Sequence, residues 1–209
     1  GISRTGSVLG VDLNQDLLKL AREEQQRDPA NGLEFALGNV YDLSSLGQTF
    51  DFVYCRFVFQ HLRDPLKALQ EISGVLNPGG TVLICDVDDS LLTLYPRHPT
   101  YDRIFLLQQK YQERQGGDRF VGRKLASYMA QAGFRDLNVH VETIPSDHLG
   151  IENFVELTIG YKLVFLKQNA EDQNYVSEQE VKGLHDDCAR GNYFGTVGLF
   201  NVSGARRST

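Results

Sequence analysis

The chain has 209 residues, of which 41% are hydrophobic and 23% are charged, and its formal net charge at pH 7 is -6. This length and composition are ordinary for a soluble globular protein and favour one compact domain spanning residues 1–209. The acidic balance argues against a nucleic-acid partner, because phosphate binding usually requires a basic face, and it favours a small-molecule substrate.

Cysteine spacing and hydropathy indicate the environment of the protein. The three cysteines, Cys55, Cys85 and Cys188, form no CxxC pair, so the sequence predicts neither a disulfide framework nor a cysteine zinc site, and it favours a reducing cytoplasm. No apolar run is long enough to span a bilayer, and the first residues lack the basic-then-apolar layout of a secretory signal. We therefore expect no membrane partner.

The amino-terminal half is predicted to alternate strands and helices. Apolar runs at residues 7–12, 33–37, 51–55 and 81–85 are typical of short buried strands. Leucines at helical spacing follow Asn14, a residue type favoured at helix N-caps. A second helix is expected over residues 65–76, where Asn77-Pro78-Gly79-Gly80 would end it and turn the chain into the next strand. This alternation implies a parallel sheet.

The rhythm of the sequence changes after Asp86. Helices are predicted over residues 101–115, 119–132, 152–169 and 177–190, and strands over residues 136–143 and 195–203. These two strands are able to pair antiparallel, which leaves helical segments near residues 92–117 and 145–192 free to cover a substrate pocket.

Several motifs stand in a specific order along the amino-terminal half. An acid, Asp12, ends the first strand, residues 50–53 (FDFV) begin the third, and residues 60–65 (QHLRDP) precede residues 76–80 (LNPGG). In order and spacing, these features resemble the class I S-adenosylmethionine-dependent methyltransferases. The resemblance covers essentially the whole chain and is strongest over residues 10–86. It implies an α/β fold with a Rossmann-like sheet of seven strands, mostly parallel with an antiparallel last strand, and helices on both faces.

One departure from the family pattern concerns the amino terminus. No GxGxG-like run precedes Gly10, whereas the first strand and glycine-rich cofactor loop of the family would lie upstream of Gly1. We therefore expect an N-terminally truncated methyltransferase whose strands at residues 7–12 and 51–55 face a gap. The missing strand would come from an upstream N-terminal segment, from a separate chain or from a homodimer partner.

The resemblance implies that Asp12, Leu13, Asn39 and Val40 belong to the cofactor site. Asp12 matches the family acid that accepts hydrogen bonds from both ribose hydroxyls, since a carboxylate offers two acceptor oxygens to a vicinal diol. Asn39 matches the residue that accepts from the adenine amino group, while the amide of Val40 meets a ring nitrogen. The alternatives are a strand-end acid that caps the next helix and an ordinary turn asparagine.

The ends of the third and fourth strands carry the remaining candidates. The resemblance places Cys55 and Arg56 against the methionine end of the cofactor, mainly through their position, and Gln60 beside the transferable methyl group. His61 titrates near neutrality and is a candidate catalytic base, with a structural or cofactor-side role as the alternative. Asp86 is a second candidate base, or an anchor for a substrate amine.

Further charged and aromatic residues allow two interpretations each. Asp86, Asp88 and Asp89 could ligate a hard cation, but carboxylates at strand ends are often solvated or capping, and we expect no metal. Aromatic residues in the carboxyl half either shape an apolar acceptor pocket or face the core; they are Tyr95, Tyr101, Phe105 and Tyr111. Basic residues there either bind an acidic substrate group or are solvated helix charges; they are His98, Arg119 and Arg123.

Together these features predict an enzyme that transfers a methyl group from S-adenosylmethionine to an O, N or C atom of a small molecule. The cofactor carries the reactivity, so the protein chiefly aligns donor and acceptor and excludes water. Two other classes remain open. A nicotinamide-dependent oxidoreductase shares the fold and an acid like Asp12, and a non-catalytic binding subunit would bind neither nucleotide.

Overall fold

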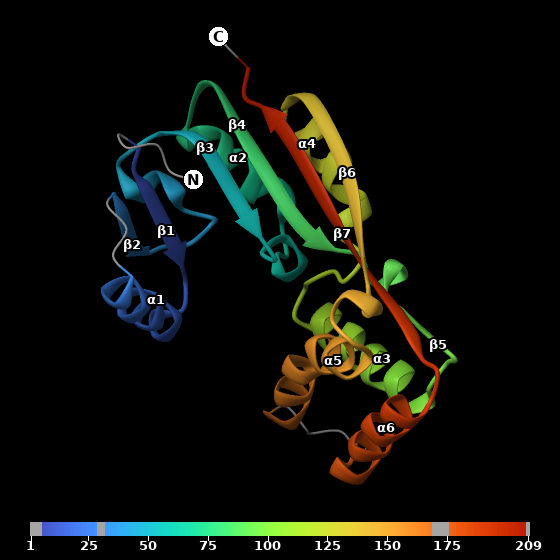
Figure 1. Ribbon diagram of the computed structural model, residues 1–209. Coiled ribbons are helices and arrows are strands. Elements are labelled where there is room, and N and C mark those ends of the chain that lie inside the picture. The colour runs from blue at the N-terminus through green and yellow to red at the C-terminus, as the bar shows by residue number, and fades with distance from the viewer. Residues whose placement is uncertain (1–5, 29–31, 169–175, 208–209) are drawn as a thin grey trace.

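The computed structural model describes residues 6–28, 32–168 and 176–207. Its amino-terminal half alternates strands and helices, as the periodicity predicts (Figure 1). Asn14 caps the first helix by accepting hydrogen bonds from the amides of Asp16 and Leu17. The elements are β1 (Val8–Asp12), α1 (Gln15–Arg27), β2 (Leu33–Leu37), η1 (Leu43–Leu46), β3 (Phe50–Arg56), η2 (Phe59–His61), α2 (Pro65–Val75) and β4 (Leu76–Val87).

The carboxyl half is mainly helical between its strands. Its elements are η3 (Asp89–Leu91), β5 (Thr93–Tyr95), α3 (Pro99–Arg114), η4 (Gly122–Lys124), α4 (Leu125–Gln131), β6 (Arg135–Pro145), η5 (Ser146–His148), α5 (Ile151–Gln168), α6 (Glu178–Arg190) and β7 (Phe194–Ala205). The predicted end of α5 at residue 169 lies outside the described residues. None of the described helices is long and apolar enough to cross a membrane.

The strands form two sheets. β1 and β2 pair in parallel, while a five-stranded sheet has the order β3-β4-β7-β5, with β6 also pairing with β7. β3 is parallel to β4, and β7 is antiparallel to β4, β5 and β6. The predicted Rossmann-like fold, with a mixed sheet and an antiparallel last strand, is confirmed. Within the described ranges no strand pairs with the outer edge of β3 or joins it to β1, as expected for the gap between these two strands.

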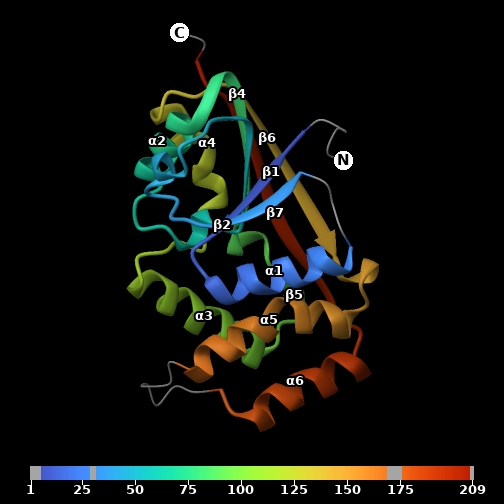
Figure 2. The same ribbon diagram turned by 90° about the vertical axis from the view of Figure 1, so that its left-hand side faces the viewer.

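Helices divide the core into two clusters. α2 and α4 pack on the five-stranded sheet, where Phe59, Ile72, Ile84 and Val202 are fully buried. α1 packs against β1 and β2. A second cluster holds α3, α5 and α6 together. Figures 1 and 2 show these three helices gathered beyond the carboxyl ends of β3 and β4, so they cover the end of the sheet where the candidate site residues lie.

The structure corrects three details of the prediction. Residues 77–80 are not a turn before β4 but part of it, accommodated by a register shift opposite Phe50 and Phe52. The helix predicted over residues 119–132 is shorter, because α4 begins at Leu125 and the preceding arginines turn toward η3 instead. The three-residue strand β5 was not predicted, since so short a segment carries no readable alternation.

Candidate functional site at the carboxyl ends of the strands

Parallel pairing places the sequence-predicted site residues at one end of the strands. Asp12 is the last residue of β1 and Arg56 the last of β3, whereas Asp86 lies one residue before the end of β4. Asn39 follows β2, and the amide of Gly38 donates to the Asp12 carbonyl oxygen at 3.1 Å. A Cβ on Gly38 would stand 2.6 Å from Cγ1 of Val11, so glycine allows the end of β2 to lie close to β1.

Asp12 combines a local role with an available carboxylate oxygen. Its Oδ1 accepts a hydrogen bond from the amide of Asn14 at 2.8 Å, and Asn14 in turn caps α1. The carboxylate therefore shapes the turn into the helix, but the helix cap is Asn14 and not Asp12, which was the alternative to a ligand-binding role. Oδ2 has no hydrogen bond within the described part of the chain, and the side chain is exposed. The neighbouring Leu13 side chain is also exposed.

Asn39 and Val40 form the turn after β2. The Asn39 Oδ1 accepts from the amide of Tyr41 at 2.9 Å, the side-chain-to-backbone pattern of an asparagine turn. A carbonyl oxygen has two acceptor positions, so this bond leaves one position of Oδ1 for a ligand. Val40 is partly buried against the main core cluster, which fixes the position of the turn.

Cys55 and Arg56 point to opposite faces of β3. Cys55 is buried, and desolvation followed by the charge of Asp86 raises the pKa of its thiol to about 12. Arg56 is exposed, and its guanidinium carbon lies 4.8 Å from the centroid of the Phe57 ring. The raised pKa keeps the buried thiol protonated, so Cys55 is a candidate site residue through its position near the end of β3 and not through thiol chemistry.

Phe57 was not predicted as a site residue. It adopts φ of +56°, a left-handed conformation that is unfavourable for a bulky side chain. Its amide donates to the carbonyl oxygen of Cys85 at 2.9 Å, which holds the residue in place at the end of β3. Strained backbone of this kind is often found at functional sites, and nothing in the sequence distinguishes Phe57 from other core aromatics.

Gln60 is a buried junction between several elements. Its backbone oxygen accepts from the amide of Asp118 at 2.8 Å and from Nε2 of Gln112 at 2.6 Å. Its side-chain Oε1 accepts from Nη1 of Arg119. Because these contacts hold both the backbone and the side chain of Gln60, the residue positions η2 and cannot swing freely toward a ligand.

His61 lies on the surface, next to this junction. Surrounding protein, followed by the charge of Arg119, lowers the pKa of the imidazole, although the side chain remains exposed to solvent. The Gln112 Nε2 that donates to Gln60 also lies 3.3 Å from Nδ1 of His61. Since that nitrogen is a donor, Nδ1 accepts, and the proton of the neutral ring is directed to Nε2.

Asp86 is enclosed, with no solvent-exposed surface. Its carboxylate accepts hydrogen bonds from the amides of Gln60 at 3.2 Å and Val87 at 2.9 Å. Burial raises the pKa of the carboxyl group to about 6, and backbone hydrogen bonds and Arg119 partly oppose that shift. The side chain stands on the same face of β4 as Val82 and Ile84, so it faces the core and anchors η2.

Two buried or half-buried ion pairs account for the acids after Asp86. Both Asp89 oxygens accept from Arg119, at 2.7 Å from Nη2 and 3.0 Å from Nε. Arg123 makes the corresponding contacts with Asp88, at 2.5 and 2.6 Å. Arg119 is therefore neither a solvated helix charge nor free to bind a substrate acid, and Asp88 and Asp89 are held by arginines.

The structure thus assembles two groups of candidate residues. Asp12 and Asn39 are neighbours on the β1–β2 sheet, while Gln60, His61 and Asp86 lie together on the five-stranded sheet. Figure 1 shows β1, β3 and β4 pointing toward the same end of the molecule. The exposed Asp12 and Asn39 side chains can bind a polar ligand across the strand ends. The buried Gln60 and Asp86 hold the adjoining loops in place.

Comparisons with known proteins find methyltransferases. A family model for a methyltransferase domain matches residues 2–84. An uncharacterised methyltransferase of Schizosaccharomyces pombe is 32% identical over 141 residues, which covers 65% of this chain and 50% of that protein. The demethylmenaquinone methyltransferase of Oceanobacillus iheyensis is 27% identical, covering 72% of this chain and 69% of its own.

A solved structure shows the same fold. Phosphoethanolamine N-methyltransferase 2 of Haemonchus contortus, crystallised with S-adenosyl-L-methionine, matches with a TM-score of 0.53 and 20% identity, covering 96% of this chain and 43% of that protein. The chain spans about half the length of the S. pombe relative.

Proposed function

We propose that the chain is a member of the class I S-adenosylmethionine-dependent methyltransferase family, and that it binds S-adenosylmethionine and promotes transfer of its methyl group to a small molecule. The observation that carries this proposal is the pair of exposed acceptor groups, Asp12 and Asn39, at adjoining strand ends.

The donor and acceptor groups present fit such a cofactor. Asp12 offers a carboxylate oxygen to the ribose hydroxyls, and Asn39 keeps one acceptor position for the adenine amino group. Leu13 and Val40 flank these groups and supply apolar surface and a backbone amide. One carboxylate and one amide oxygen suit the hydroxyl and amino groups of a nucleoside. A hard cation would require several more oxygen ligands.

Residues at the ends of β3 and β4 would line the reacting part of the site. The exposed Arg56 guanidinium is able to pair with a cofactor carboxylate. Gln60 and Cys55 fix the neighbouring backbone through their buried contacts. When bound, S-adenosylmethionine supplies an electrophilic methyl group, so the main tasks of the protein are alignment and exclusion of water.

Of the two candidate bases, His61 is the one that a ligand can reach. Its lowered pKa keeps the ring neutral at pH 7, the form that a base requires. Gln112 directs the ring proton to Nε2, so Nε2 can accept a substrate proton only in the other tautomer, which requires the long 3.3 Å contact between Gln112 and Nδ1 to break. Asp86 is enclosed and accepts hydrogen bonds from backbone amides, so we assign it a positioning role.

The substrate class rests on composition and on one relative. The net charge of -6 favours a small molecule over a nucleic acid. The O. iheyensis relative is named for demethylmenaquinone, a small molecule, which supports the same class here. The acceptor atom is proposed to be O, N or C, and the protein is proposed to act in the cytoplasm.

Ligand titration tests the proposal. We expect calorimetry to show S-adenosylmethionine binding and no NAD binding, and Asp12→Asn to weaken the cofactor affinity about ten- to a hundredfold, because a hydrogen bond to a charged group is worth roughly 1.5 to 3 kcal/mol. Asp12→Asn can keep the bond from Asn14, so the turn is preserved. Asp16→Asn removes an equivalent charge in the first turn of α1 and serves as the control. NAD binding would favour the oxidoreductase, and unchanged affinity in Asp12→Asn would refute the ribose assignment.

A further inference from the structure

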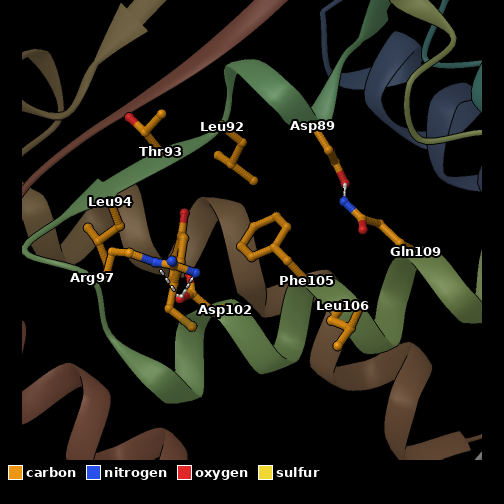
Figure 3. A pocket seen from close by; sticks show the side chains of 10 residues that line it. Asp89, Leu92, Thr93, Leu94, Arg97, Asp102, Phe105, Leu106 and Gln109 are labelled. Atoms are coloured by element: carbon orange, nitrogen blue, oxygen red, sulfur yellow. Dashed lines mark hydrogen bonds and ion pairs between the residues drawn. The ribbon is translucent and has the colours of Figure 1, made fainter.

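A cleft of about 390 Å³ opens between η3, β5 and α3, next to the end of β4. This volume is within the usual range for small-molecule sites. Four apolar side chains line it, those of Leu92, Leu94, Phe105 and Leu106. Figure 3 shows Phe105 and Leu92 at the centre, with polar side chains at the two ends. The cleft therefore suits a ligand with an apolar body.

At the inner end, Asp89 and Gln109 line the cleft. Asp89 is already bound by Arg119 on both oxygens, and both side chains are almost fully buried, at 2% and 3% exposed. Gln109 Nε2 approaches Oδ2 of Asp89 at 3.4 Å, a long contact. A hydroxyl or N–H group of a ligand can replace this contact, because a carboxylate accepts several hydrogen bonds.

At the outer end, Arg97 pairs with Asp102 at 2.7 Å. The two ion pairs therefore balance both lining carboxylates, since each has its own arginine. A charged ligand would have to separate an existing pair or remain without a counter-ion, and the buried Asp89–Arg119 pair makes that especially unfavourable. An uncharged ligand meets neither penalty.

Hydrogen bonds connect the inner end of the cleft to the strand ends. Arg119 binds Asp89 and, through Nη1, the side chain of Gln60, while the amide of Gln60 donates to Asp86. One continuous set of hydrogen bonds thus joins the cleft to the end of β4. A ligand lying in the cleft with its polar group at Asp89 would point that group toward the proposed cofactor site.

We propose that this cleft binds the methyl acceptor, and that the acceptor is an uncharged molecule with an apolar body and a hydroxyl or N–H group at one end. The apolar body lies between Leu92 and Phe105, and the polar group binds at Asp89 and Gln109. The role as acceptor site rests on the proposed methyltransferase function, whereas the ligand class rests on the cleft itself.

Fluorescent probes that differ only in charge test the ligand class. N-phenyl-1-naphthylamine is uncharged, and 8-anilino-1-naphthalenesulfonate carries the same rings with a sulfonate. Leu106→Arg places a long charged side chain at the cleft, while Leu157→Arg makes the same change at an exposed leucine of α5 that does not line it. The two leucines are 50% and 59% exposed, so neither substitution disturbs the core.

We expect the uncharged probe to bind wild type and Leu157→Arg with equal affinity and Leu106→Arg about tenfold or more weakly, a change of about one decade in dissociation constant. Displacement by 1-naphthol, which is uncharged, should exceed displacement by 1-naphthoate. Equal binding of the uncharged probe to both variants would overturn the site, and a sulfonate probe that binds as tightly, with the same dependence on Leu106, would overturn the ligand class.

A parallel titration with S-adenosylmethionine separates this inference from the proposed function. Leu106→Arg is expected to leave cofactor affinity unchanged, and Asp12→Asn to leave probe affinity unchanged. If the probe results hold but wild type fails to bind S-adenosylmethionine, the proposed function fails and the acceptor role fails with it, while the cleft and its ligand class stand.

Discussion

Breaking the buried Asp89–Arg119 pair should destabilise the protein strongly. Arg119 donates to both oxygens of Asp89 at 2.7 and 3.0 Å, and both side chains are at most 3% exposed. Asp89→Asn leaves a buried guanidinium without its counter-charge, a change that costs about 3 to 5 kcal/mol in comparable pairs. The exposed pair of Lys124 and Asp118, at 44% and 28% exposed, is the control, and Lys124→Met should cost about 0 to 1 kcal/mol.

Urea unfolding followed by circular dichroism measures both changes. With an m-value of about 2 kcal/mol per molar, the Asp89→Asn midpoint should fall by roughly 2 M, and the control midpoint by less than about 0.5 M. Adding Arg119→Met to Asp89→Asn should recover a large part of the loss, because the unpaired charge is removed. The reasoning is wrong if Asp89→Asn matches the control, or if the double variant is no more stable than the single one.

Two further predictions concern a buried lysine and the strand edges. Burial lowers the pKa of Lys162 from 10.5 to about 6. Between these two pH values the unfolded state binds more protons than the folded state, so the free energy of unfolding rises with pH by at most about 1.4 kcal/mol per pH unit. Lys162→Met should remove that slope in urea titrations at pH 6.5 to 9, and an unchanged slope would contradict the prediction. The outer edge of β3 has no partner in the described ranges, whereas β4 pairs on both sides. Amide hydrogen exchange should therefore be about tenfold or more faster in β3 than in β4. Equal protection of the two strands, in a protein whose mass in solution is twice that of the chain, would instead favour strand pairing in a homodimer.

Local patterns were sufficient to predict most of the fold. The strands β1 to β4 and their helices follow from apolar runs and caps, and Asn14 caps α1 as its type suggests. The alternation of Val82, Ile84 and Asp86 also carried a signal that was not used: residues two apart share a face of a strand, which would have placed Asp86 toward the core.

The ion pairs between residues far apart in the chain could not be predicted from the sequence. Arg119 and Asp89 are 30 positions apart, and Arg123 and Asp88 are 35 apart, so no helical or strand period relates them. The sequence therefore left these arginines open between a substrate contact and a solvated surface, whereas the structure buries Arg119 against Asp89 and leaves the paired Arg123 side chain 49% exposed. The left-handed backbone of Phe57 was equally hidden, because phenylalanine is a residue type that rarely adopts this conformation.

The cofactor-binding residues and the cleft, the two parts of the proposed site, differ in how the sequence specifies them. The groups assigned to the cofactor, Asp12 and Asn39, are placed by hydrogen bonds to residues only two positions away, so a short motif is enough to specify them. The cleft is lined by residues of η3, β5 and α3 between Asp89 and Gln109, and its inner end is held by Arg119, which lies 30 positions from Asp89. Changes in α3 or β5 can therefore alter what the cleft accepts without touching the strand ends, and the identity of the acceptor has to be sought in the cleft, not in the motifs.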